Sequence, residues 1–182
     1  PVVMAVTRSK PDPEDQEKRI EETETVTLNS RKAIWLKDKS EISEEEYHEF
    51  YKHISHDFAE PAKTIHYKAE GTTEFAALLY LPKQRPFNIY YQDYKIGPTL
   101  YVRRVQIMDH CEAMLPPYLR FVKGVVDSAD LPLNVSRELL QESRDVKAIR
   151  EGCTKRVLSM LESLADSESG DDKAKYMKFW GE

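Results

Sequence analysis

The chain has 182 residues, of which 40% are hydrophobic and 32% are charged, so it can build one domain of ordinary size with a packed core. Its net charge of -5 disfavours a dedicated nucleic-acid-binding protein, because such proteins usually carry a basic face. No apolar run approaches the ~20 residues of a membrane-spanning helix, and the first residues lack the charged-then-apolar pattern of a secretory signal. Cys111 and Cys153 are too few for a disulfide framework, and two free thiols in a reducing compartment are expected.

The two ends of the chain suggest a segment of a longer, soluble protein. The sequence begins at Pro1 and enters an apolar run at once. It stops directly after the aromatic cluster at residues 176–180, which we expect to pack on something outside the chain.

The first part of the chain predicts two short strands separated by an acidic loop. Residues 2–7 are apolar and β-branched, as in a buried strand, and residues 24–28 alternate. Residues 8–22 are polar, acidic and contain proline, which favours a solvated, mobile loop.

A capped helix and four strands are predicted next. Ser43 and Glu46 form a capping box, and apolar residues recur after it at helical spacing for about three turns. The strands are expected at residues 65–69, 75–81, 100–108 and 121–126. The second is apolar throughout and suits a central strand covered on both faces. The third loses its alternation at Arg103 and Arg104, which indicates a bulge or a change of environment. Gly124, inside the fourth, indicates a bulge or a close backbone approach.

From residue 143 the pattern is helical. Ser143 caps a helix in which apolar residues from Val146 to Leu164 follow 3-and-4 spacing, and a second helix is expected from about Asp172. Strands with interspersed helices, followed by a helical tail, predict an α/β layered fold. We therefore expect residues 1–142 to form a sheet domain with an acidic loop at 8–22, and residues 143–182 to form a helical connector.

Few residues have the spacing of a complete catalytic or metal site. His48, His53 and His56 cluster near the capped helix, but an amphipathic surface explains them more simply than a metal site. There is no glycine-rich phosphate-binding loop, nucleophile elbow, CxxC or HExxH motif. A complete active site within these residues is not expected.

Residues 131–141 are the most informative segment. Ser136 suits a helix N-cap, so Arg137 would occupy the first helical position, where a cation opposes the helix macrodipole. One explanation is a surface ion pair of Arg137 with a nearby carboxylate. The other is an anion site, in which free N–H groups, the dipole and the guanidinium converge on one ligand. Gln141 lies four residues on and would share that helical face. The residues alone leave both explanations open.

Two aromatic segments have a similar ambiguity. Residues 86–91 are rich in aromatic side chains, and Trp35 lies between Ile34 and Leu36 in a polar stretch. Packing in the core is one explanation for both, and a docking surface for a partner domain is the other.

Several long motifs resemble the ninety-kilodalton heat-shock chaperone family. They lie at residues 45–52, 71–75, 81–87, 100–105 and 121–141, so the similarity covers nearly the whole chain. The resemblance implies the first part of that family's middle domain, a split β-α-β sheet domain like the second domain of ribosomal protein S5. Helices then lead to a smaller α/β subdomain that lies beyond this chain. Because the acidic segment is short, the chain resembles a bacterial or organellar member more than a eukaryotic cytosolic one. The bacterial, high-temperature protein G type, which is cytoplasmic, is favoured over a member of an organellar matrix.

The resemblance also implies a function and a set of residues. Arg137 matches the middle-domain arginine that contacts the γ-phosphate of ATP, and Gln141 matches a glutamine that supports it. Asn134 and Ser136 match positions that shape this loop. Phe87 matches an apolar contact to the N-terminal domain, and Trp35 falls in a region for client or partner contacts.

In that family, ATP with Mg²⁺ is bound mainly by a separate N-terminal domain, so no cofactor and no metal site are expected in this chain. The partners implied are that ATPase domain, a C-terminal dimerisation domain, unfolded client proteins and co-chaperones, with no nucleic acid and no membrane. The alternative function is a non-catalytic scaffold for protein interactions, in which Arg137 is merely structural.

Overall fold

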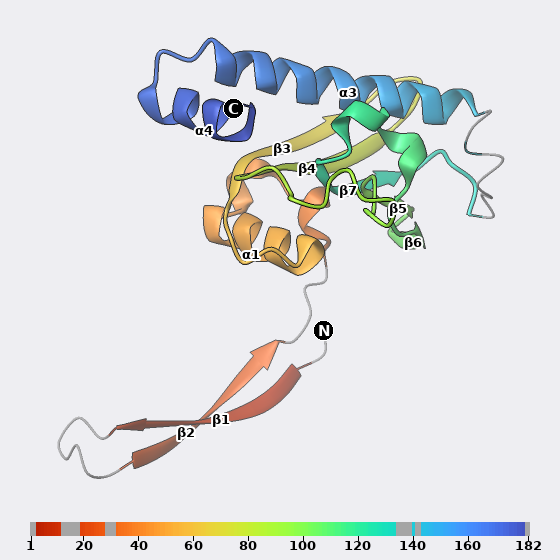
Figure 1. Cartoon of the computed structure of the whole chain (residues 1–182). Coiled ribbons are helices and arrows are strands. Elements are labelled where there is room, and N and C mark those ends of the chain that lie inside the picture. The colour runs from red at the N-terminus through yellow and green to blue at the C-terminus, as the bar shows by residue number, and fades with distance from the viewer. Residues whose placement is uncertain (1–2, 12–18, 28–31, 134–139, 141–142, 181–182) are drawn as a thin grey trace. The chain divides into compact units, whose positions relative to one another are not determined.

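The computed structural model describes residues 3–11, 19–27, 32–133, 140 and 143–180. They belong to two compact units, Pro1–Ile34 and Trp35–Glu182 (Figure 1). The boundary that the sequence suggests at residue 142 falls inside the second unit and stays a prediction. No helix among the described residues is long and apolar enough to cross a membrane.

The first unit is an antiparallel hairpin of β1 (Val3–Pro11) and β2 (Arg19–Thr27), in which Val3 pairs with Thr27 and Pro11 pairs with Arg19. The loop predicted over residues 8–22 is therefore wrong at both ends, because residues 8–11 and 19–22 are strand. The charge density of this segment suggested solvation, but its two ends continue strands whose flanking residues Thr7, Thr23 and Thr25 are β-branched, which favours extended backbone. The burial predicted for residues 2–7 is also wrong at Met4, which is 50% exposed.

The second unit is built on a five-stranded mixed sheet of order β3-β4-β7-β5-β6. Its strands are β3 (Pro61–Ala69), β4 (Phe75–Pro82), β5 (Thr99–Val102), β6 (Val105–Met108) and β7 (Lys123–Ser128). β7 runs antiparallel to β4 and parallel to β5. Every residue of β4 is buried, which confirms the prediction of a central strand covered on both faces.

The single long strand predicted over residues 100–108 is instead a hairpin of β5 and β6. The chain reverses at Arg103 and Arg104, whose φ angles are 50° and 69°. Two-residue hairpin turns with positive φ at both positions usually carry Asn or Gly, so an Arg-Arg pair gave no turn signal. Gly124 has a φ of 147°, and a Cβ at this position would lie 2.2 Å from the Leu78 carbonyl oxygen, so the expected close backbone approach is confirmed.

Helices cover both faces of the sheet, as Figure 1 shows, and the predicted α/β class is confirmed. α1 (Glu44–Ser55) packs on one face and α3 (Arg144–Ala165) on the other, followed by α4 (Gly170–Trp180). The capping box of α1 is formed as predicted, because the Glu46 N–H donates to Ser43 Oγ at 3.2 Å and the Ser43 N–H donates to Glu46 Oε2 at 3.1 Å. Short 3-10 helices connect the larger elements: η1 (Ile34–Leu36), η2 (Lys39–Glu41), η3 (Glu112–Met114) and η4 (Pro117–Leu119).

One hydrophobic core joins the sheet to α3 and α4. It includes buried residues from β4, β5 and β7 and a stripe along α3 that contains Ile149, Cys153 and Val157. Phe179 of α4 is 3% exposed, and its ring centroid lies 4.9 Å from that of Phe121. This part of the terminal aromatic cluster, expected to need a partner outside the chain, therefore packs within it. Both cysteines are free and buried, and burial raises the pKa of the Cys153 thiol to about 12.

Lys123, at the start of β7, supplies a test of this packing. Burial, with a smaller contribution from the nearby charge of Lys95, lowers the pKa of Lys123 from 10.5 to about 8. Between these two values the unfolded chain binds more protons than the folded chain, so the contribution of Lys123 to stability rises with pH. We expect the parent chain to gain on the order of 2 kcal/mol relative to Lys123→Met between about pH 7 and about pH 10. Urea unfolding of both chains across this range measures the difference, and a pH-independent difference would contradict the burial of the ammonium group.

Candidate interdomain site

The residues that the sequence places at the centre of the site lie in a segment of which only the two ends are described. Asn134, Ser136, Arg137 and Gln141 all lie outside the described residues. The structure therefore tests the setting of the loop, and the roles of these four residues stay predictions. Its described parts are residues 131–133, Leu140 and the start of α3.

The loop leaves the sheet at the end of β7, where Ser128 fixes its direction. Ser128 is fully buried, and its Oγ accepts hydrogen bonds from the backbone N–H groups of Asp130 and Leu131, both at 3.3 Å. Leu131 is 1% exposed and belongs to the hydrophobic core. A buried hydroxyl and a buried leucine thus hold the first end of the loop.

The second end is held by the core and by a helix cap. Leu140 is 1% exposed and Val146 is 3% exposed, so the chain re-enters the core before and after α3 begins. Ser143 Oγ accepts from the Val146 N–H at 3.5 Å as the N-cap of α3. The segment between Leu131 and Leu140 is therefore anchored in the core at both ends.

The turn between β3 and β4 braces both ends of the loop. The Ala129 N–H donates to the Glu74 carbonyl oxygen at 3.1 Å, and the Glu74 N–H donates to the Asp130 carboxylate. Thr73 Oγ1 donates to Asp145 Oδ1, in the first turn of α3, at 3.0 Å. Two neighbouring residues of one turn thus connect to the segment before the loop and to the helix after it.

Asp127, the residue before Ser128, ties two more segments to the same strand end. Its carboxylate is 6% exposed and accepts from Trp35 Nε1 at 2.9 Å and from the Arg104 N–H at 3.2 Å. The Arg103 N–H continues the pattern by donating to the Ser128 carbonyl oxygen at 3.0 Å. This role of the β5–β6 turn was not predicted from the sequence, although the lost alternation at Arg103 and Arg104 marked the position.

The two aromatic segments differ in burial. Trp35 is 7% exposed, and its ring centroid lies 4.8 Å from that of Tyr101, so it packs inside the second unit, and a contact with a partner stays a prediction. Phe87, in contrast, is 89% exposed, next to Tyr90 at 76% and Tyr91 at 60%. These three exposed aromatic side chains lie close together in the sequence, and aromatic side chains are enriched at protein interfaces.

The histidines near α1 do not form a metal centre in the described part of the chain. His48 Nδ1 lies 3.6 Å from Glu60 Oε1, and no group of three or more His, Cys, Asp or Glu residues among the described residues could hold a metal ion.

The arrangement at the end of β7 consists of hydrogen bonds that position the backbone, which suits a scaffold for a presented loop.

Comparison with known proteins decides the family. Residues 4–182 match the family described as Hsp90 protein. The chain belongs to the Hsp90 family. It is 57% identical to the chaperone protein HtpG of Burkholderia lata, 54% identical to that of Geobacter sulfurreducens and 60% identical to that of Cupriavidus taiwanensis. These alignments cover 92%, 100% and 90% of the chain, but only 27%, 28% and 25% of the relatives.

A solved structure identifies the region of the Hsp90 protein that this chain represents. The chain superposes on the middle domain of a Plasmodium falciparum heat shock protein with a TM-score of 0.68 and 27% sequence identity. The match covers 82% of this chain and 57% of that one. The chain therefore corresponds to the middle domain of an Hsp90-family protein, and it spans about a quarter of the length of the HtpG relatives.

The hydrogen bonds of Asp127 supply a test of the site's framework. Asp127→Ala leaves the buried indole N–H of Trp35 and the partly buried backbone N–H of Arg104 without their acceptor. We expect a loss of about 2–4 kcal/mol in the free energy of unfolding, measured by urea titration with circular dichroism. Asp93→Ala, at an exposed position, is the matched control and should change stability by less than about 0.5 kcal/mol. Equal stabilities of the two variants would show that Asp127 does not hold these segments.

Proposed function

We propose that this chain is the part of an ATP-dependent molecular chaperone that supplies Arg137 to ATP bound in a separate N-terminal domain. The observation that carries the proposal is the attachment of the loop at both ends. Leu131 and Leu140 are buried in one core, and a single turn at Thr73 and Glu74 braces the residues on either side. Catalysis between domains requires a contributed side chain to be held at a reproducible place, and two fixed ends favour this.

Arg137 would act as an arginine finger. A guanidinium neutralises charge on the transferred phosphoryl group, and its planar fork matches two phosphate oxygens. Gln141, four residues further on, would lie on the same helical face and add a hydrogen bond. Asn134 and Ser136 would set the conformation of the loop in front of Arg137. ATP with Mg²⁺ would be bound mainly by the N-terminal domain, since this chain has six glycines and no glycine-rich phosphate-binding loop.

This division of the active site would couple ATP hydrolysis to domain closure, because Arg137 contributes only when the two domains meet. The further partners proposed are a C-terminal dimerisation domain, unfolded or partly folded client proteins, and co-chaperones. The exposed ring of Phe87 is proposed as an apolar contact to the N-terminal domain, and Trp35 as part of a client or partner region. The bacterial relatives support a cytoplasmic location.

A non-catalytic interaction scaffold is the second candidate function. The exposed side chains of Phe87, Tyr90 and Tyr91 favour it, because they offer apolar surface to a partner without any reaction. The two candidate functions differ in the role of Arg137. The catalytic function requires it for ATP hydrolysis, whereas in the scaffold Arg137 is merely structural.

Substitution of Arg137 in the full-length protein separates the two functions. Arg137→Ala should lower the rate of ATP hydrolysis at least about a hundredfold, because it removes stabilisation that exists only in the transition state. Nucleotide affinity, measured by calorimetry, should stay nearly unchanged. Arg137→Lys should recover part of the rate, since it keeps the charge and loses the fork.

Arg150→Ala, at an exposed position of α3, is the control and should keep the parent rate of hydrolysis. Unchanged turnover in Arg137→Ala would reject the catalytic role and leave the scaffold. The 182-residue chain alone should neither bind ATP tightly nor hydrolyse it, and measurable affinity in calorimetry would show that the nucleotide site is misplaced.

A further inference from the structure

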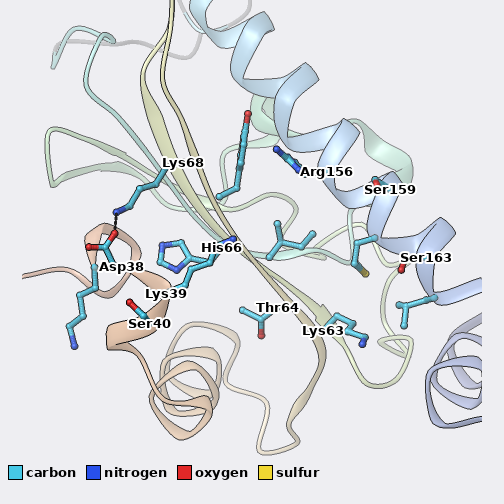
Figure 2. Close-up of a pocket in the computed structure, with 15 residues that line it drawn as sticks. Asp38, Lys39, Ser40, Lys63, Thr64, His66, Lys68, Arg156, Ser159 and Ser163 are labelled. Carbon is cyan, nitrogen blue, oxygen red and sulfur yellow. Dashed lines mark ion pairs between the residues drawn. The ribbon is translucent and has the colours of Figure 1, made fainter. Parts of the chain in front are cut away.

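An open groove runs along β3, at the edge of the sheet opposite β6 (Figure 2). The cavity has a volume of about 1020 Å³. β3 forms its floor from Lys63 to Lys68, residues 37–40 form one wall, and the second half of α3 forms the other. All of these residues belong to the second compact unit.

The floor of the groove offers unpaired backbone. β3 pairs with β4 on one side only, and it ends the sheet. In an antiparallel pair, alternate residues direct their N–H and C=O groups away from the partner strand. Within the part of the chain that the structure describes, no segment pairs with this outer edge of β3. An extended chain placed in the groove therefore meets donors and acceptors at the spacing of a β-strand.

The walls of the groove are positively charged. Its lining includes one carboxylate, Asp38, and five cationic side chains: Lys37, Lys39, Lys63, Lys68 and Arg156. Three of the cations have acidic neighbours, because Lys37 pairs with Glu46, Lys63 pairs with Asp172 and Lys68 lies 3.6 Å from Asp38. Lys39 and Arg156 have no carboxylate partner among the described residues. The Arg156 guanidinium lies 4.5 Å from the centre of the Tyr67 ring.

Protection of the sheet edge does not explain these two cations. Lysines on an edge strand commonly prevent it from pairing with other chains, and this accounts for Lys63 and Lys68. Lys39 and Arg156 are not on the strand, however, but on η2 and α3, the two elements that flank it. Figure 2 shows them on either side of β3. An arrangement of this kind places positive charge on both sides of an added strand.

We propose that the groove binds an extended, acidic peptide segment of a partner protein, which adds a strand to β3. Successive side chains of a strand point to opposite faces of the sheet, so carboxylates at neighbouring positions of the peptide reach Lys39 on one wall and Arg156 on the other. His66 takes no part in recognition, because its Nε2 lies 3.0 Å from the Trp35 carbonyl oxygen and its Nδ1 lies 2.7 Å from the Tyr47 hydroxyl. The site adds to the interdomain role of Arg137 and does not depend on it.

A labelled peptide tests the proposal on the 182-residue chain. The probe is a fluorescein-labelled peptide of about eight residues, built from Glu with interspersed Val and Thr, and binding is measured by fluorescence anisotropy. Two matched peptides serve as controls. One carries Lys in place of every Glu, and the other carries N-methyl groups on alternate backbone amides, which keeps the charge but removes the hydrogen-bond donors of one edge. Both should bind at least about tenfold more weakly than the probe.

Charge reversal in the chain locates the site. Lys39→Glu combined with Arg156→Glu should weaken binding of the acidic peptide at least about tenfold. Lys155→Glu combined with Lys178→Glu makes the same change in net charge at exposed positions outside the groove, and should change affinity less than about threefold. Circular dichroism melting of both double variants checks that each is folded.

Several outcomes would overturn the proposal. Equal binding of the N-methylated peptide would show attraction by charge alone, without strand addition. Equal weakening by the two double variants would place the peptide elsewhere on the surface. Absence of binding by the acidic peptide, or tighter binding of single-stranded RNA than of the peptide, would reject an acidic protein segment as the occupant. None of these outcomes bears on the Arg137 experiment, which is made in a different protein preparation with a different readout.

Discussion

Buried polar groups at the end of β7 need partners from elsewhere in the chain, and this requirement organises the second unit. Asp127 and Ser128 are 6% and 0% exposed, so leaving their hydrogen bonds unmade would cost about 1–3 kcal/mol for each polar group. Trp35 and the β5–β6 turn satisfy Asp127, and the residues that follow β7 satisfy Ser128. Segments far apart in the sequence are therefore joined at the point where the loop to Arg137 begins.

The same constraint bears on how this chain would serve an ATPase whose nucleotide is bound in another domain, as proposed. An arginine contributed by another domain accelerates hydrolysis only if little free energy is needed to place it at the nucleotide when the domains close. The core supplies the two fixed ends at Leu131 and Leu140, and the β3–β4 turn relates these ends to each other. The proposed activity is thus divided, with phosphate binding in one domain and the charge that stabilises the transition state in another.

Several local features of the fold could be predicted from the sequence, whereas contacts between distant residues could not. The capping box at Ser43 and the uniformly apolar β4 lie within short windows, so their structures were predictable. Trp35 and Asp127 are 92 residues apart, and no local pattern indicates their hydrogen bond. The β5–β6 turn was missed because Arg103 and Arg104 adopt backbone angles that other residues usually signal. The basic groove was not predictable either, because Lys39 and Arg156 are far apart in the sequence and line one groove only in the folded chain.

The candidate site itself could be predicted from the sequence in two steps. Spacing alone predicted an arginine at a helix start and left both an ion pair and an anion site open. The resemblance of residues 121–141 to a chaperone family supplied the specific role, and the family assignment is now confirmed by the match over residues 4–182. The attachment of the loop at Ser128, Leu131 and Leu140 was visible only in three dimensions.

The most direct test is the structure of the full-length protein that contains this chain, closed on ADP with a mimic of the γ-phosphate. The account predicts that the Arg137 guanidinium donates hydrogen bonds to the mimic at about 2.7–2.9 Å, with Leu131 and Leu140 still buried in the middle domain. A closed structure in which Arg137 turns away from the nucleotide and pairs with a carboxylate of its own domain would contradict it.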